Sequence, residues 1–129
     1  IFMDKVKTSL IEAEKGSQLF EIEFANQKAL DELVMLPTAI RAKCFYLLER
    51  MKVDGPNLGE PFTKKIAGTG SLFEIRAKAL EGIGRCIYCV CVQKRIVILH
   101  SFVKKTQKTP AKNLEIALKR YKEFINDNY

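Results

Sequence analysis

A segment near the C-terminal end of the chain combines residue types that could bind and cleave a phosphate linkage. It begins at Ile96 with an apolar, β-branched run, which predicts a strand buried on both faces. His100 and Phe102 follow. Thr109 can cap a helix, and Pro110 fits its first position. Three lysines lie between Phe102 and Thr109: Lys104, Lys105 and Lys108. The pattern predicts a rigid strand end that holds several cations close together, which suits a phosphate backbone.

Two arginines are expected beside this strand end. Arg76 lies on the polar side of an alternating segment, and Arg85 opens the following strand after a glycine-rich turn. Such a turn joins antiparallel neighbours, so both guanidinium groups should share one concave sheet face with His100. A guanidinium can donate two parallel hydrogen bonds to a phosphate. The alternative for Arg76 is an ion pair with Glu74 or Glu81.

The remaining residues favour a metal-free cleavage of RNA. The chain has no P-loop and no H-E-x-x-H motif, and its basic half has few carboxylates for a glycosidase or a magnesium nuclease. The RNA's own 2′-OH would attack the adjacent phosphate, while the protein orients the nucleotides, neutralises charge and handles two protons. His100, Lys104 or Lys105 could handle the protons, because neighbouring cations lower the pKa of a lysine. A core histidine with satisfied ring nitrogens is the alternative for His100. No cofactor is expected.

The four cysteines do not predict a metal site. Cys86, Cys89 and Cys91 lie in one expected strand, on which Cys86 and Cys89 point to opposite faces. Cys44 lies in an expected helix. A zinc site needs ligands that tight turns bring together, so we expect buried free thiols in a reducing cytosol.

Length and composition predict a single domain over residues 1–129, with a hydrophobic fraction of 47%. No apolar run approaches the about 18 residues that span a membrane, and the first residues lack a secretory pattern, so a cytoplasmic protein is expected. The net charge of +7 is uneven: residues from Glu60 onward carry +8 and the first 59 carry −1. This asymmetry favours a polyanion partner on one side of the molecule. The alternative is a basic, solvated surface without a binding role, which explains the C-terminal lysines best.

The hydrophobic periodicity predicts an α+β fold of two layers, in which helices lie on one side of an antiparallel sheet. Residues 1–18 form an additional N-terminal segment with a helical pattern. Asn26 can cap the first helix of a hairpin, and Pro37 can open the second, which ends at Asp54. The expected strands cover residues 19–24, 62–67, 72–78, 86–92 and 96–103, and a last helix covers residues 110–126.

These segments resemble the phage-derived, HigB-like toxins of the RelE superfamily over about residues 19–121. The blocks that carry the resemblance are Gly55–Pro61, Lys64–Lys65, Gly70–Arg76, Arg85 with Tyr88, and Leu99–Pro110. The resemblance implies a RelE-like α+β fold with an N-terminal helical hairpin and a C-terminal helix. It also implies a type II toxin that enters the ribosomal A site and cuts mRNA, leaving a 2′,3′-cyclic phosphate. A HigA-type helix-turn-helix antitoxin would neutralise it in a hetero-oligomeric complex.

The resemblance also assigns roles to single residues. Arg85 matches an arginine that contacts the scissile phosphate, and Arg76 matches the basic residue on the strand before it. The candidate catalytic residues are thus Arg76, Arg85, His100, Lys104 and Lys105. The candidate RNA-binding residues are Lys64, Lys65, Lys78, Phe102, Lys108, Lys112 and Tyr121, the last as a base-stacking tyrosine. Two alternatives stay open: a non-catalytic, gyrase-targeting inhibitor of the ParE type, and a phage-derived nucleic-acid-binding module without toxicity.

Overall fold

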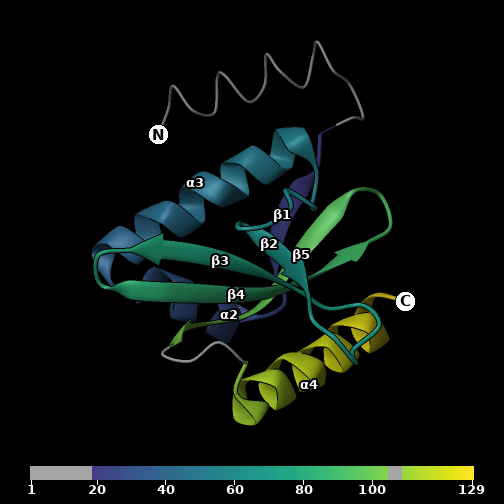
Figure 1. Ribbon diagram of the computed structural model, residues 1–129. Coiled ribbons are helices and arrows are strands. Elements are labelled where there is room, and N and C mark those ends of the chain that lie inside the picture. Colours follow the sequence, from purple (N-terminus) through teal and green to yellow (C-terminus); the bar gives the residue numbers. More distant parts are fainter. Residues whose placement is uncertain (1–18, 105–108) are drawn as a thin grey trace.

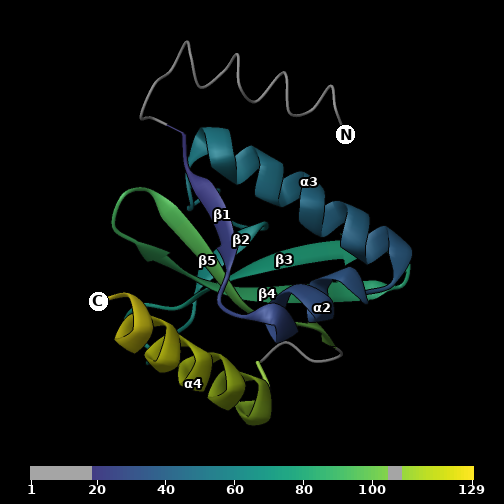
Figure 2. The same ribbon diagram turned by 180° about the vertical axis from the view of Figure 1, so that it is seen from behind.

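The computed structural model describes residues 19–104 and 109–129, which form a five-stranded sheet with helices on both faces (Figures 1 and 2). The order of strands in the sheet is β1-β5-β4-β3-β2. The elements in chain order are β1 (Glu21–Phe24), α2 (Gln27–Val34), α3 (Thr38–Asp54), β2 (Thr63–Lys65), β3 (Phe73–Ala79), β4 (Gly82–Cys91), β5 (Arg95–Lys104) and α4 (Ala111–Asn128). The mixed α+β class and the order of the elements are confirmed.

Two details of the predicted layout are wrong. The sheet is mixed, because β1 runs parallel to β5 while the other neighbours are antiparallel. The helices also do not share one side, since α3 and α4 lie on opposite faces of the sheet (Figure 1). Strands β4 and β5 are buried on both faces along most of their length. They therefore need a cover on each face, and the apolar side of α4 supplies the second one.

Each face of the sheet has its own core. The α3-face core contains Ile40, Leu47, Met51, Ile75, Cys86, Tyr88, Ile96 and Ile98, among others. The α4-face core contains Leu72, Ile87, Cys89, Val97, Leu99, Ala117 and Phe124, among others. Cys86 and Cys89 thus point to opposite faces, as predicted, and Cys86 Sγ lies 3.5 Å from Cys44 Sγ. Within the described ranges no cluster of three His, Cys, Asp or Glu side chains could hold a metal ion.

Side chains cap the two helices that follow β1. Asn26 Oδ1 accepts a hydrogen bond from the Ala29 N–H at 2.9 Å, which confirms the predicted cap of α2. At α3, Glu81 Oε1 accepts from the N–H groups of Ala39 and Ile40 at 2.9 and 3.0 Å. Glu81 lies in the β3–β4 turn, so this carboxylate fastens the hairpin to the start of α3.

The hairpin and α3 also approach each other closely at Gly84. A Cβ atom built there would lie 2.3 Å from Ile40 Cγ2, which is too close for two non-bonded carbon atoms. Glycine is therefore required at this point of β4 for α3 to pack so near the sheet.

A bulge in β5 changes the direction in which the side chains of its second half point. Ile98 pairs with Tyr88 and His100 pairs with Ile87, so Leu99 is an extra residue on β5. Beyond Ile98, strand β1 no longer pairs with β5. There Glu32 of α2 covers the strand edge and accepts from the Ser101 N–H at 3.3 Å.

Candidate phosphate-binding site

Arg76 and Arg85 lie directly opposite each other on β3 and β4. The Arg76 N–H donates to the Phe62 carbonyl on the other side of β3, at 2.8 Å. The two arginines therefore form the non-hydrogen-bonded kind of antiparallel pair, in which Cα atoms are about 4.5 Å apart. The sheet brings the two arginines together, as the sequence predicts, on the face that α4 covers.

The two arginines differ in their partners. Arg85 is only 2% exposed, and its guanidinium forms an ion pair with Glu74. Glu74 Oε2 also accepts from the Thr109 hydroxyl at 3.1 Å, so Thr109 binds β3 and does not cap α4 as predicted. Burial and the nearby Arg76 lower the pKa of Arg85, while Glu74 opposes this shift. Glu74 therefore holds the Arg85 guanidinium below the surface, and the predicted contact of Arg85 with the scissile phosphate stays a prediction.

Lys104 joins the arginines from β5. It lies opposite Ile83 in the register of β4 and is 4% exposed. Burial lowers its pKa, and the charges of Arg85 and Arg76 lower it further, with Glu74 opposing. This direction agrees with the expectation that neighbouring cations lower the pKa of a lysine at this strand end. We call Arg76, Arg85, Lys104 and Glu74 the cationic cluster.

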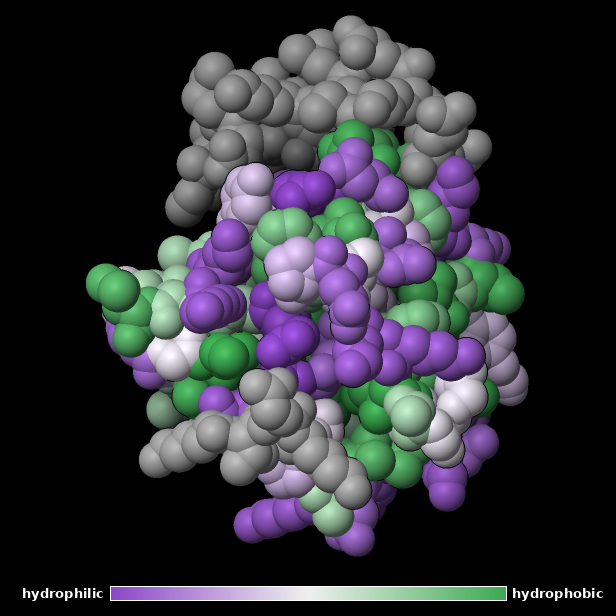
Figure 3. All heavy atoms as spheres, viewed as in Figure 1, coloured by the Kyte–Doolittle hydropathy of each residue, from purple (hydrophilic) through white to green (hydrophobic). Residues whose placement is uncertain are grey.

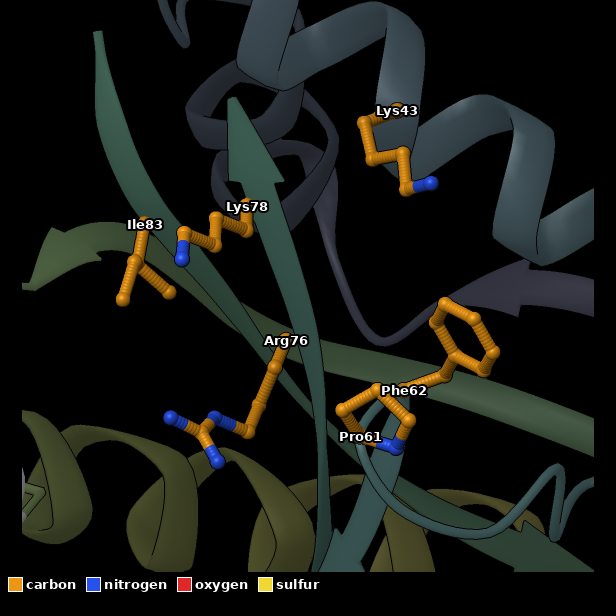
Figure 4. Close-up of a pocket in the computed structure, with 6 residues that line it drawn as sticks. All are labelled: Lys43, Pro61, Phe62, Arg76, Lys78 and Ile83. Carbon is orange, nitrogen blue, oxygen red and sulfur yellow. The ribbon is translucent and has the colours of Figure 1, made fainter. Parts of the chain in front are cut away.

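Arg76 is the least buried member of this cluster. Among the described residues it forms no ion pair, because Glu74 binds Arg85 and Glu81 caps α3. Its guanidinium points away from β3 into a groove of about 470 Å³ (Figure 4). We call this the edge groove; its lining residues are Lys43, Pro61, Phe62, Arg76, Lys78 and Ile83. The space-filling view, from the same direction as Figure 1, shows hydrophilic side chains gathered across the middle of that face (Figure 3).

His100 lies in a different environment from the one predicted. Its ring is 5% exposed, with Nδ1 at 2.8 Å from Glu32 Oε1 and Nε2 at 2.7 Å from Asn113 Oδ1. Arg120 donates to both oxygens of Glu32, at 2.7 and 2.9 Å, and to the Leu99 carbonyl at 3.0 Å. Both ring nitrogens are therefore engaged, which is the alternative that the sequence left open for His100. The role of His100 as an acid or base stays a prediction.

The predicted RNA-binding residues are divided between the surface and the core. Lys64 and Lys65 are exposed on β2, Lys78 on β3, and Lys112 at the start of α4. Phe102 stacks on His100 with ring centroids 5.3 Å apart, and together with Tyr121 it packs against the α4-face core. Tyr121 is therefore half-buried, with part of its ring in the core. Lys105 and Lys108 lie outside the described residues.

Sequence reasoning missed the residues that complete these two sites. Lys43 and Phe62 line the edge groove, but their spacing along the chain gives no sign that α3 and the loop before β2 meet. Glu32, Asn113 and Arg120 surround His100. Arg120 lies among lysines, so the run suggested only a solvated helix face.

A family model shows what kind of chain this is. The model described as phage derived protein Gp49-like (DUF891) matches residues 31–122, which include the hairpin of Arg76 and Arg85. The chain belongs to the Gp49-like family. The curated proteins include no significant match to this Gp49-like chain.

A solved structure supports the fold of the Gp49-like chain. This chain is similar to a chain in the crystal structure of an archaeal RelE–RelB complex from Pyrococcus horikoshii OT3, with 26% sequence identity and a TM-score of 0.50. The similarity covers 66% of this chain and 94% of that one. The Gp49-like protein therefore has a RelE-like fold. No helix in the described residues is long and apolar enough to cross a membrane.

Proposed function

We propose that this Gp49-like protein is the toxin of a type II toxin–antitoxin module, of the HigB-like kind, and inhibits translation by cutting mRNA in the ribosomal A site. The observation that carries the proposal is the cross-strand pair of Arg76 and Arg85 with Lys104 beside it. Three cations gathered around one carboxylate suit the extra negative charge of a pentavalent phosphate. The RelE-like fold supports the same assignment.

The reaction needs no metal ion. The 2′-oxygen attacks phosphorus, the bond to the 5′-oxygen breaks, and a 2′,3′-cyclic phosphate remains. Arg76 donates hydrogen bonds to the non-bridging oxygens, because it is the least buried of the three cations and lines the edge groove. Arg85 lies behind it and adds positive potential. The lowered pKa of Lys104 suits transfer of one of the two protons. Lys105 is a further candidate, and His100 acts by positioning.

The partners follow from the same assignment. The substrate is mRNA on the ribosome, and exposed lysines such as Lys64, Lys65 and Lys112 contact RNA. A helix-turn-helix antitoxin of the HigA type binds the toxin in a cytoplasmic hetero-oligomer. The similar solved structure is itself a RelE–RelB complex, which supports an antitoxin partner.

Expression of the protein with pulse labelling tests the assignment. We expect incorporation of a labelled amino acid to fall at once, with thymidine incorporation unaffected at first and mRNA ends mapping to codons within reading frames. Arg76→Ala should abolish these effects, whereas Lys122→Ala, on the exposed side of α4, should keep them. An early fall in thymidine incorporation would contradict the proposal and support a gyrase-type inhibitor. An absence of both effects would leave a binding module without toxicity.

A further inference from the structure

We propose that the edge groove binds the single-stranded RNA segment next to the cleaved linkage, with a base against the Phe62 ring and backbone phosphates at Lys43 and Lys78. The inference rests on the proposed function for the identity of the RNA. It concerns residues outside the cationic cluster, however, and it can fail independently.

The groove exists because β2 is short. Strand β2 pairs with β3 only at Phe73, Glu74 and Ile75, and the chain before it reaches β3 through the Arg76 N–H bond to Phe62. In the described chain, the rest of β3 has no neighbouring strand on that side. Because Gly84 lets α3 pack close to the sheet, Lys43 on the flank of α3 comes near this open edge.

The lining of the groove is cationic. Lys43 comes from α3, and Arg76 and Lys78 come from β3, while none of the six lining residues is acidic. Figure 4 shows Arg76 and Lys78 extending from one side of β3, with Lys43 and Phe62 on the other, so the groove passes around the strand edge. Its volume of about 470 Å³ lies within the range of about 300–1,000 Å³ for ligand sites. The ligand is therefore expected to be an extended anion.

Phe62 distinguishes RNA from other anions. Lys43 Nζ and Arg50 Cζ lie 5.5 and 5.4 Å from the centre of its ring, and the ring packs partly against the α3-face core. A fixed aromatic ring among cations is the combination that single-stranded nucleic acids bind, because every base has a face that can stack. An acidic peptide would satisfy the lysines but would give the ring no role.

The groove also continues the proposed active site. Arg76 belongs both to the cationic cluster and to the groove lining. A strand with one phosphate at Arg76 would place its neighbouring nucleotides between Lys78 and Phe62. The groove would thereby orient the linkage for attack by its own 2′-OH.

Fluorescence anisotropy with a 2′-O-methyl oligoribonucleotide tests binding without cleavage, since the attacking hydroxyl is blocked. At low salt, Lys43→Gln should weaken binding by about threefold to tenfold and lower the slope of log K against log salt by about 0.7. Phe62→Leu keeps an apolar side chain for the core but removes the stacking face, and should weaken binding by about fivefold or more. Lys122→Gln is the matched control, because it removes the same charge at a distant site. It should change the affinity and the salt slope only slightly.

Unchanged binding by both variants, or no binding by the wild-type protein, would overturn the inference. So would a poly-glutamate peptide that competes as well as the oligonucleotide and loses affinity equally in Phe62→Leu. Cell-free translation separates the two proposals. If the wild-type protein cuts mRNA while both variants bind RNA normally, only the groove assignment fails. If the variants lose RNA binding but the wild-type protein never cuts, only the proposed function fails.

Discussion

Arg76 and Arg85 are directly opposed across β3 and β4, yet only Arg85 has a carboxylate partner among the described residues. Like charges at opposed positions destabilise a sheet. Glu74 offsets the charge of one arginine and leaves the other facing the edge groove. In the proposed function the two residues therefore have separate roles: Arg85 stabilises the site through Glu74, and Arg76 contacts the substrate.

Replacing Arg76 should therefore separate function from stability. We expect Arg76→Ala to abolish translation arrest while leaving the thermal midpoint equal to that of the wild type or slightly higher, because a repulsion is relieved. Arg76→Lys should recover only part of the activity, since an ammonium cannot donate the paired hydrogen bonds of a guanidinium. Pulse labelling and thermal unfolding measure the two effects. Full activity of Arg76→Ala would show that Arg76 does not take part in cleavage.

Replacing Arg85 should instead act on stability. Arg85→Ala leaves Glu74 buried without its partner, and breaking a buried ion pair costs about 3–5 kcal/mol. Urea unfolding measures the free energy of unfolding. Arg50→Ala is the matched control, because Arg50 and Asp54 form an exposed pair at 3.6 Å that contributes about 0–1 kcal/mol. Equal losses in the two variants would show that the Glu74 pair adds nothing to the fold.

The sequence indicated the strand pair and the two arginines correctly, because alternation over Phe73–Lys78 and the glycine-containing turn are local signals. It could not indicate which of the two arginines forms the ion pair with Glu74. Both arginines lie on the same face as this carboxylate, and the choice depends on burial beneath α4. The parallel pairing of β1 with β5 was also missed, because it joins segments that are far apart in the sequence. The partners of His100 could not be predicted, because Glu32 and Asn113 approach it from two different helices.

His100→Gln tests the positioning role of the histidine. Glutamine can also bond to both Glu32 and Asn113, so we expect mRNA cleavage to continue, with an unchanged dependence on pH and a small loss of thermal stability. The measurement is the rate of cleavage in a cell-free translation system between about pH 6 and 8, where a histidine titrates. A properly folded His100→Gln protein that no longer cleaves would restore His100 as an acid or base.

The stability of α4 should depend on pH through Glu32. Burial raises the pKa of Glu32, but hydrogen bonds and charge from Arg120 and His100 outweigh it, so the pKa is lowered from about 4.5. A lowered pKa means that the folded state binds fewer protons, so the stabilisation is present above about pH 4.5 and is lost as the pH falls through the folded value. Glu32→Gln should cost about 3 kcal/mol at pH 7.

This cost should shrink as the pH falls from 4.5 through the lowered pKa of folded Glu32, below which both proteins carry an uncharged side chain at position 32. Urea unfolding at pH 7 and pH 3 gives the comparison. Glu115→Gln, on the exposed side of α4, is the control and should show almost no cost at either pH. A cost for Glu32→Gln that stays constant with pH would contradict the assignment.

Gly84→Ala should destabilise the protein by about 1–3 kcal/mol, because the added methyl group meets Ile40 Cγ2. The same change should weaken RNA binding in the edge groove, since α3 must move away from the sheet. Truncation of Ile40 makes room for the methyl group, so the double variant with Ile40→Ala should be less destabilised than the two single changes predict together. Additive losses would place the clash elsewhere.

The carboxylate of Glu81 joins the β3–β4 turn to the first turn of α3. This attachment lies three residues beyond Lys78 on one wall of the groove and three residues before Lys43 on the other. It therefore ties the two walls together at this end of the edge groove. The width between Lys78 and Lys43 is thus set in part by a carboxylate that lines neither wall.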